Sequence, residues 1–418
     1  MPTPWNWKVE KRLVADLGKL TGEQGELKEV TVGPDGESAA AVFEREPNKP
    51  NIAVGDKVWE GDLEKAWQLR FSPDGRAMAL VRIDDQWTVM VDGEAWEERF
   101  DFAWNPKLTP DGKAIAVQVK RDDRYGVAVN GVAWSDLFIS CRDYVVSDDG
   151  KHVAATAQLE AVPEADIVKF REGTWGVVVD GKAWGTKYLN TYAPIISPDG
   201  MHVAAEVRVE PQAYSIAQDG QMWNARFGCV WEPQFRDNTR VLAPVRHKGA
   251  WTLAQDGELI WKNRFVQLWR QQVAPSGGRV AAVVATDYGR WTVAVDDVVW
   301  PVTFGQMVLQ PQFSPDGRHV AAMVKDNGHW GIAVDGKPWS DSFDMVWNPV
   351  FSPDGEVAVA KVERGGHIGL ASRTKFWAND MERLWDPVFS PDGKNLLVRG
   401  MAAGKVFRQV VPTAELAS

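Results

Sequence analysis

Cysteine is scarce in this chain, which holds only Cys141 and Cys229 among its 418 residues. Two thiols far apart in the sequence, with no Cys or His clustered beside them, cannot form a disulfide framework. They also cannot ligate structural zinc or an iron–sulfur centre. We therefore expect both to be buried, reduced thiols of a cytoplasmic protein.

An excess of basic charge and long apolar runs are missing as well. Lys and Arg number 47 against 57 Asp and Glu, so the net charge is −10. An acidic chain without clustered basic residues lacks the footprint of a nucleic-acid-binding surface. No apolar run approaches the roughly 18 residues of a transmembrane helix, and residues 1–14 contain no apolar core of a secretory signal. The sequence thus predicts no membrane span and no export.

The sequence motifs of common enzyme classes are absent too. The chain has no Gly-X-Ser-X-Gly elbow, no P-loop and no glycine fingerprint for a dinucleotide. His152, His202 and His319 each follow a turn in the same recurring phrase, so we interpret them as repeat positions rather than metal ligands. The prediction is a protein that is not an enzyme, with no catalytic residues, no cofactor and no metal site.

What the chain does have is a short phrase that returns ten times, about 40 residues apart. Its clearest form, Phe-Ser-Pro-Asp-Gly, occupies residues 71–75, 313–317, 351–355 and 389–393. Weaker copies stand at 34–36, 110–112, 148–150, 198–200, 236–238 and 275–277. A fixed period of this length indicates an array of small supersecondary units that bury their faces against their neighbours.

One unit can be divided into strands. Between residues 349 and 385, a short strand, the Pro-Asp-Gly turn, an alternating apolar strand, a third strand and a Trp-bearing fourth follow one another. A second turn, Asp-Gly or Asn-Gly, joins the third strand to the fourth, because this pair suits a type I′ hairpin. Four short antiparallel strands per unit are typical of a β-propeller blade. The sequence predicts an all-β propeller of about ten four-stranded blades; two five-bladed rings in tandem are the alternative.

Tryptophan is abundant, with 22 residues against six tyrosines. Most of the tryptophans recur with the period of the repeat, one set on the fourth strand, one on the next first strand and one opening the third. A strict structural period favours packing between blades over electron hopping or a sugar-stacking surface.

The two ends of the chain hold parts of one unit. The last repeat lacks its fourth strand, and residues 12–20 resemble the third-strand phrase with Leu20 in place of the tryptophan. We therefore expect a single domain, residues 1–418, whose closing blade is shared by residues 1–28 and 387–412. Such sharing hides the edge strands of a propeller.

One unit is about a dozen residues longer than the others, and the excess lies at residues 160–171, between its second and third strands. Loops that vary on a regular scaffold commonly carry function. We therefore predict a partner-binding site on the face that bears this insertion, with Glu164, Asp166, Lys169 and Phe170 as its contacts.

The repeat phrase resembles that of the periplasmic protein TolB and its WD40-like relatives over essentially the whole chain. A narrower resemblance rests on Trp-Asn-Pro at 104–106 and 347–349, Trp-Glu-Pro at 231–233, and Asp-Gly-Lys-x-Trp at 180–184 and 335–339. With these tryptophan-rich phrases the chain looks like the D subunit of the Tmc transmembrane electron-transfer complex of sulfate-reducing bacteria. In that family partner subunits hold the haems and iron–sulfur clusters, and no cofactor is recognised in the D subunit.

This resemblance implies a cytoplasmic scaffold or docking subunit of a membrane-associated redox complex involved in sulfate respiration. Its partners would be iron–sulfur and cytochrome subunits, met at the inner face of the cytoplasmic membrane. The alternative is a stand-alone propeller that binds a ligand, either a sugar, as a lectin does, or another small molecule.

Overall fold

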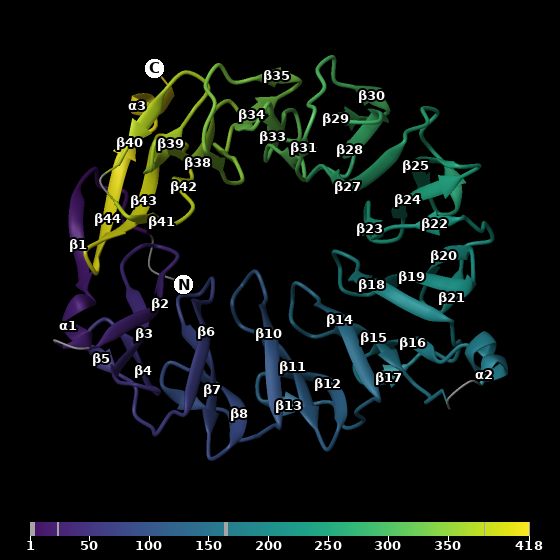
Figure 1. Cartoon of the computed structure of the whole chain (residues 1–418), viewed down its shortest axis with the longest axis horizontal. Helices are drawn as coiled ribbons and strands as arrows, with labels where there is room; N and C mark the ends of the chain where they lie inside the picture. Colours follow the sequence, from purple (N-terminus) through teal and green to yellow (C-terminus); the bar gives the residue numbers. More distant parts are fainter. Residues whose placement is uncertain (1–4, 23–24, 163–165, 380, 418) are drawn as a thin grey trace.

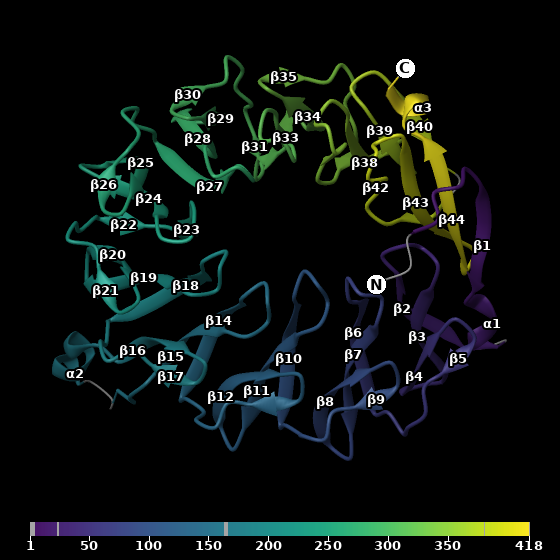
Figure 2. The same ribbon diagram turned by 180° about the vertical axis from the view of Figure 1, so that it is seen from behind.

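Ten antiparallel sheets follow one another around a single ring (Figures 1 and 2). This computed structural model describes residues 5–22, 25–162, 166–379 and 381–417. Each sheet has four strand positions, numbered here from the centre of the ring outward, and each sheet is one blade. The ten-bladed propeller predicted from the repeats is confirmed, and the alternative of two five-bladed rings is wrong.

The first five blades contain β2 (Glu26–Val32), β3 (Ala39–Glu46), β4 (Lys49–Val54) and β5 (Lys57–Val58); β6 (Lys65–Phe71), β7 (Ala77–Ile83), β8 (Gln86–Val91) and β9 (Glu94–Ala95); β10 (Phe102–Leu108), β11 (Ile115–Arg121), β12 (Arg124–Val129) and β13 (Val132–Ala133); β14 (Ser140–Val146), β15 (Val153–Gln158), β16 (Trp175–Val179) and β17 (Lys182–Ala183); and β18 (Asn190–Ile196), β19 (Val203–Glu210), β20 (Ala213–Gln218) and β21 (Gln221–Met222).

Five blades remain, and in all of them except the one that begins with β27 the first strand is split in two. These blades contain β22 (Cys229–Val230), β23 (Gln234–Phe235), β24 (Val241–His247), β25 (Ala250–Gln255) and β26 (Glu258–Leu259); β27 (Gln267–Val273), β28 (Val280–Asp287), β29 (Arg290–Val295) and β30 (Val298–Val299); β31 (Met307–Val308), β32 (Gln312–Phe313), β33 (Val320–Asp326), β34 (His329–Val334) and β35 (Lys337–Pro338); β36 (Met345–Val346), β37 (Val350–Phe351), β38 (Ala358–Arg364), β39 (His367–Ala371) and β40 (Phe376–Ala378); and β41 (Arg383–Leu384), β42 (Val388–Phe389), β43 (Asn395–Ala402), β44 (Lys405–Pro412) and β1 (Lys11–Asp16). The described residues also form three short helices: α1 (Gly18–Thr21), α2 (Ile167–Glu172) and α3 (Ala414–Ala417).

The second strands of the blades are largely apolar on both faces. In β7, for example, residues 77–81 read Ala-Met-Ala-Leu-Val and are all buried, as are the five residues Ala-Ala-Ala-Val-Phe that open β3. A strand covered on both sides reads as a continuous apolar run. Here the covering layers are the two neighbouring blades, so the core of the molecule is a series of clusters between blades.

The tryptophans of the fourth strands pack on the hairpin turn of the next blade. A Cβ placed on Gly93 would lie 3.2 Å from Trp59, and one on Gly336 would lie 3.2 Å from Trp300. The same contact joins Trp96 to Gly131, Trp134 to Gly181 and Trp223 to Gly257. Because the glycines have positive φ and no side chain, the indole ring can lie against the backbone of the turn. The period of the fourth-strand tryptophans is thus explained by packing.

The aspartates of these hairpin turns have a second structural role. Asp180 has a φ of 49°, and its side chain accepts a hydrogen bond from the backbone N–H of Val153, which opens the second strand, at 2.8 Å. Its other carboxylate oxygen lies 2.8 Å from Nδ1 of His152. The same pair forms between His202 and Asp219 and between His319 and Asp335. These histidines therefore tie together the two turns of one blade.

The ring closes where the first strand of the chain lies beside the last, β1 next to β44 in Figure 1. β1 pairs with β44 as the outermost strand of the last blade, with Lys11 opposite Gln409. Residues 11–16 therefore form a fourth strand and not the third that the phrase at 12–20 suggested, because β44 already occupies the third position. The strands of this sheet lie within 11–16 and 383–412, whereas the expected ranges were 1–28 and 387–412, and β2 already belongs to the next blade.

Candidate functional site

The insertion, residues 160–171, follows β15 and contains most of α2, which lies at the outer edge of the ring beside β16 (Figure 1). The helix begins at Asp166, whose side chain accepts a hydrogen bond from the backbone N–H of Lys169 at 2.9 Å. It ends at Gly173, where φ is 85°. An N-cap aspartate and a C-terminal glycine are common boundaries of a short helix.

The base of the insertion is fixed to the blade. Glu160 accepts a hydrogen bond from Lys187 at 2.7 Å and lies 3.4 Å from the ammonium of Lys169. A Cβ on Gly173 would lie 2.5 Å from the backbone of Tyr188, in the connection to the next blade, so only glycine fits this approach. The helix is therefore held in one orientation and is not a free loop.

The exposed residues of α2 are apolar at three positions, beside the charged Arg171 and Glu172. No residue of the helix is buried, and the side chains of Ile167, Val168 and Phe170 are 63%, 64% and 42% exposed. Val162, just before the helix, is 37% exposed. Exposed apolar side chains are unremarkable singly, but four of them gathered in one short segment mark a candidate contact surface. We call these four residues the apolar face of the insertion.

The structure assigns different roles to the residues predicted as partner contacts. Asp166 caps the helix and Lys169 pairs with Glu160, so both serve the local fold. Phe170 belongs to the apolar face. Glu164 lies outside the residues that the structure describes. The sequence analysis did not single out Ile167 and Val168, although an apolar pair in a segment between strands was the available signal.

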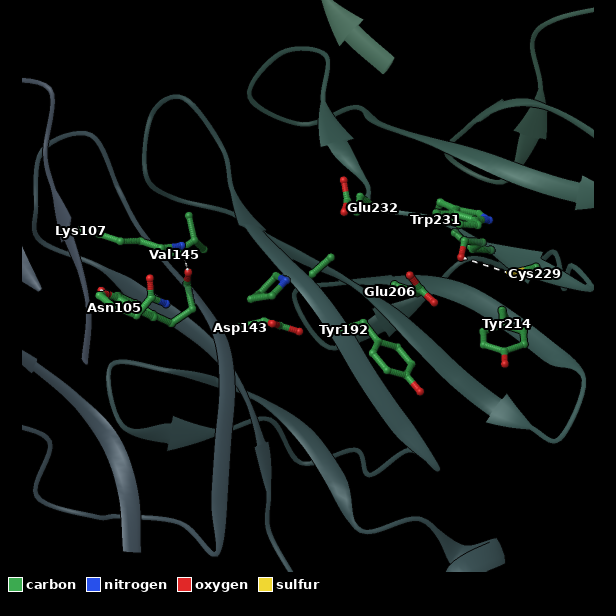
Figure 3. Close-up of a pocket in the computed structure, with 14 residues that line it drawn as sticks. Asn105, Lys107, Asp143, Val145, Tyr192, Glu206, Tyr214, Cys229, Trp231 and Glu232 are labelled. Atoms are coloured by element: carbon green, nitrogen blue, oxygen red, sulfur yellow. Dashed lines mark hydrogen bonds between the residues drawn. The ribbon is translucent and has the colours of Figure 1, made fainter. Parts of the chain in front are cut away.

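A second candidate site, which the sequence analysis missed, is a cavity of about 680 Å³ between the inner strands of the third to sixth blades (Figure 3). Its lining includes three carboxylates, Asp143, Glu206 and Glu232, one ammonium group, Lys107, and four aromatic rings, Tyr144, Tyr192, Tyr214 and Trp231. In Figure 3 Glu206 lies among Tyr192, Tyr214 and Trp231, and Glu232 and Asp143 both lie to one side of it. The volume is that of a small-molecule site.

Glu206 is the unusual residue of this cavity. It projects from β19, a strand whose neighbouring positions 203–205 and 207 are all buried apolar residues. Burial, together with the negative charges of Glu232 and Asp143, raises the pKa of Glu206 to about 8. The carboxyl group therefore holds a proton at neutral pH. A single acidic residue within an apolar second strand was the signal that could have revealed the cavity.

The two cysteines differ in their surroundings but both are poor nucleophiles. Cys141 is buried and Cys229 is half-buried against the cavity. Burial raises the pKa of Cys141 to about 12 and also raises the pKa of Cys229. A reactive cysteine needs a depressed pKa, because the thiolate is the nucleophile.

The residues that the structure describes contain no group of three or more His, Cys, Asp and Glu side chains that could hold a metal ion. None of the helices formed by these residues has the length and apolar character that a membrane span requires.

Comparison of the chain with protein-family models and with curated proteins finds no match. Among solved structures, a crystal structure of a eukaryotic initiation factor is similar at 12% identity and a TM-score of 0.47, covering 82% of this chain and 95% of that one. The Dos1 propeller is similar at 14% identity and a TM-score of 0.38, covering 97% of this chain and 95% of that one. Similarities of this size carry no argument about function. The class of the protein, a ten-bladed β-propeller, follows from its own strand pairing.

Proposed function

We propose that this propeller is a non-catalytic docking subunit that binds a protein partner through the apolar face of the insertion. The observation that carries the proposal is that Ile167, Val168 and Phe170 are exposed on a helix whose base is fixed. A fixed apolar surface loses little conformational entropy on binding, so it is suited to docking. Propellers commonly mediate protein–protein interactions, which fits this role.

The partners we propose are the iron–sulfur and cytochrome subunits of a membrane-associated electron-transfer complex, on the cytoplasmic side of the membrane. The support for this step is the resemblance of the tryptophan-rich phrases to the D subunit of the Tmc complex. In such an assembly the propeller would supply binding surface, and its partners would carry the redox groups.

The test replaces the apolar face and leaves the fold intact. In a triple variant, Ile167→Ser, Val168→Ser and Phe170→Ser, we expect an unchanged melting temperature, because the three side chains are exposed. Co-purification of haem and iron–sulfur proteins from membrane extracts of the native cells should fall at least about tenfold, as expected for losing a central apolar contact. Absorbance spectra and metal analysis of the co-purified material identify the redox groups.

Tyr288→Ser provides the matched control. Tyr288 is 93% exposed and lies in the loop between the second and third strands of another blade, the same position that bears the insertion in its own blade. Undiminished co-purification by the triple variant would place the docking surface elsewhere. Partners that carry no haem and no iron would contradict the redox assignment while retaining the docking role.

The alternative of a ligand-binding propeller has one observation in its favour, the cavity around Glu206. Its lining of carboxylates and aromatic rings favours a small molecule.

A further inference from the structure

The space between the ninth and tenth blades contains an internal ammonium site. The ammonium of Lys361, on β38, donates to the backbone carbonyl of Leu384 at 3.3 Å and to the carboxylate of Asp386 at 3.0 Å. It also lies 4.8 Å from the centre of the Trp347 ring. An aromatic face, a carbonyl oxygen and a carboxylate together provide what a primary ammonium group requires.

The fifth and sixth blades repeat this arrangement at the cavity. Tyr192 pairs with Glu206 across β18 and β19 in the same way as Trp347 pairs with Lys361. On the next blade, Trp231 occupies the position of Trp385, since the backbone N–H of each donates to the second strand of its own blade.

The residues on either side of these tryptophans then correspond as well. Val230 stands where Leu384 stands, and Glu232 stands where Asp386 stands. Tyr192, Val230 and Glu232 all line the cavity. The cavity therefore has the aromatic ring, the carbonyl oxygen and the carboxylate of the ammonium site, but Glu206 stands at the position of the lysine.

The replacement reverses the hydrogen-bonding character of the position. In the third blade the same position is Gln118, whose amide donates to the backbone carbonyl of Cys141 on the next blade at 3.1 Å. Both Gln118 and Lys361 thus donate to a carbonyl oxygen on the neighbouring first strand. A protonated Glu206 carries one donor hydrogen, whereas an ionised Glu206 can only accept, as the Val230 carbonyl and the Glu232 carboxylate do. A cation that donates to all three can therefore take the place of the proton.

We propose that this cavity binds an organic primary ammonium ion, held between the carboxylates of Glu206 and Glu232, the Val230 carbonyl and the Tyr192 ring. The cavity, at about 680 Å³, leaves room for an alkyl chain in addition to the ammonium group. Asp143 lines the same cavity and could receive a second ammonium group of a diamine. The inference does not depend on the docking role of the insertion.

Binding should be linked to release of a proton. Because burial and the two neighbouring carboxylates raise the pKa of Glu206 to about 8, a cation must displace its proton at neutral pH. The other titratable groups that line the cavity are Lys107 on β10, Asp143 and Tyr144 on β14, Tyr192 on β18, Tyr214 on β20, Cys229 on β22 and Glu232 just after it. The ammonium of Lys107 donates to the backbone carbonyl of Tyr144. The raised pKa values of Tyr192 and Cys229 keep both groups neutral through this range.

The experiment is isothermal titration of the full chain with n-butylammonium, and with n-butanol as the neutral probe of the same shape. We expect binding of the ammonium only, with an affinity that rises roughly tenfold per pH unit up to pH 8 and levels off above it. Nα-acetyl-lysine methylamide tests whether the natural source is a lysine side chain: tighter binding than n-butylammonium would favour a partner protein, and weaker binding a free amine.

Two substitutions complete the test. Glu206→Gln should lower the affinity for n-butylammonium at least about tenfold, because the substitution removes a charge-assisted hydrogen bond. Glu206→Lys should abolish binding, since the new side chain reproduces the Lys361 arrangement. Glu210→Gln, at the exposed end of the same strand, is the control and should bind as the original chain does. Equal binding of n-butanol, unchanged binding by Glu206→Gln, or no binding by the original chain would each overturn the proposal. If Glu206→Lys does not fold, the pH profile and Glu206→Gln still decide.

Discussion

Glu206 makes the stability of this propeller depend on pH. Its pKa is about 8 in the folded chain against an ordinary value of 4.5, mainly because of burial. Between these two values the folded state holds a proton that the unfolded state has released. The contribution of the protonated Glu206 to the free energy of unfolding is therefore fully present below pH 4.5 and is lost as the pH rises toward 8.

The expected contribution is a fall in unfolding free energy of up to about 1.4 kcal/mol per pH unit within this window. Glu206→Gln removes the titrating group and should flatten this part of the profile. Urea unfolding of both proteins at pH 5.5, 7 and 8.5 measures the effect. Profiles that run parallel would show that Glu206 keeps an ordinary pKa.

At the scale of the element, each blade depends on contacts with the turn of its neighbour. The glycine of the Asp-Gly turn must adopt positive φ and must also leave room for the tryptophan of the preceding blade. The positive φ is a requirement of the local backbone, whereas the space for the tryptophan is a requirement of tertiary packing. Substitutions at two glycines of the chain can measure the two effects separately.

Gly336→Ala should destabilise the protein by more than Gly289→Ala. Gly336 has a φ of 73°, and an added Cβ would lie 3.2 Å from Trp300 and 3.1 Å from Pro301. Gly289 has a φ of 67° with no atom within 4 Å of an added Cβ, so it reports backbone strain alone, about 1 kcal/mol. Chemical unfolding of the two variants gives the difference. Equal losses would mean that the indole ring moves away without cost.

At the scale of the whole molecule, the ring depends on the joining of its two ends. Arg408 on β44 is fully buried, and its Nε donates to the backbone carbonyl of Asp35 at 3.0 Å and lies 3.1 Å from Glu37. Glu37 also pairs with Arg12 of β1. Two strands of the last blade and a turn of the first blade therefore share one ionic group, of which Arg408 is the buried member.

Deleting residues 1–20 should lower the melting temperature and broaden the transition. The deletion removes β1, uncovers the edge of β44 and takes away the Arg12 partner of Glu37. An uncovered edge strand also favours aggregation. Calorimetry and light scattering measure both effects. Replacing residues 160–171 by a short Gly-Ser turn is the control, since it alters a loop and no strand pair. A truncated chain that melts like the full one would show that β1 contributes nothing to closure.

The sequence by itself determined the repeat, the number of blades and the packing role of the tryptophans. These features are local in the sequence. The Pro-Asp-Gly and Asp-Gly turns reverse the chain between neighbouring strands of one blade, and both turns recur about every 40 residues. It also located the insertion, because Glu160 to Arg171 interrupts the period. It did not show that Asp166 and Lys169 would be used within the insertion, since that depends on where Glu160 and Tyr188 lie in space.

Only the tertiary structure decided where Glu206 points and what surrounds it. Tyr192 and Glu206 belong to one blade, while Val230 and Glu232 belong to the next, and nothing in their spacing along the chain pairs them. The raised pKa arises from burial between two blades, which is a property of packing and not of residue type. The fold could be predicted because the turns and the strand pattern of each repeat lie close together in the sequence. The cavity could not, because it forms only where neighbouring blades face each other.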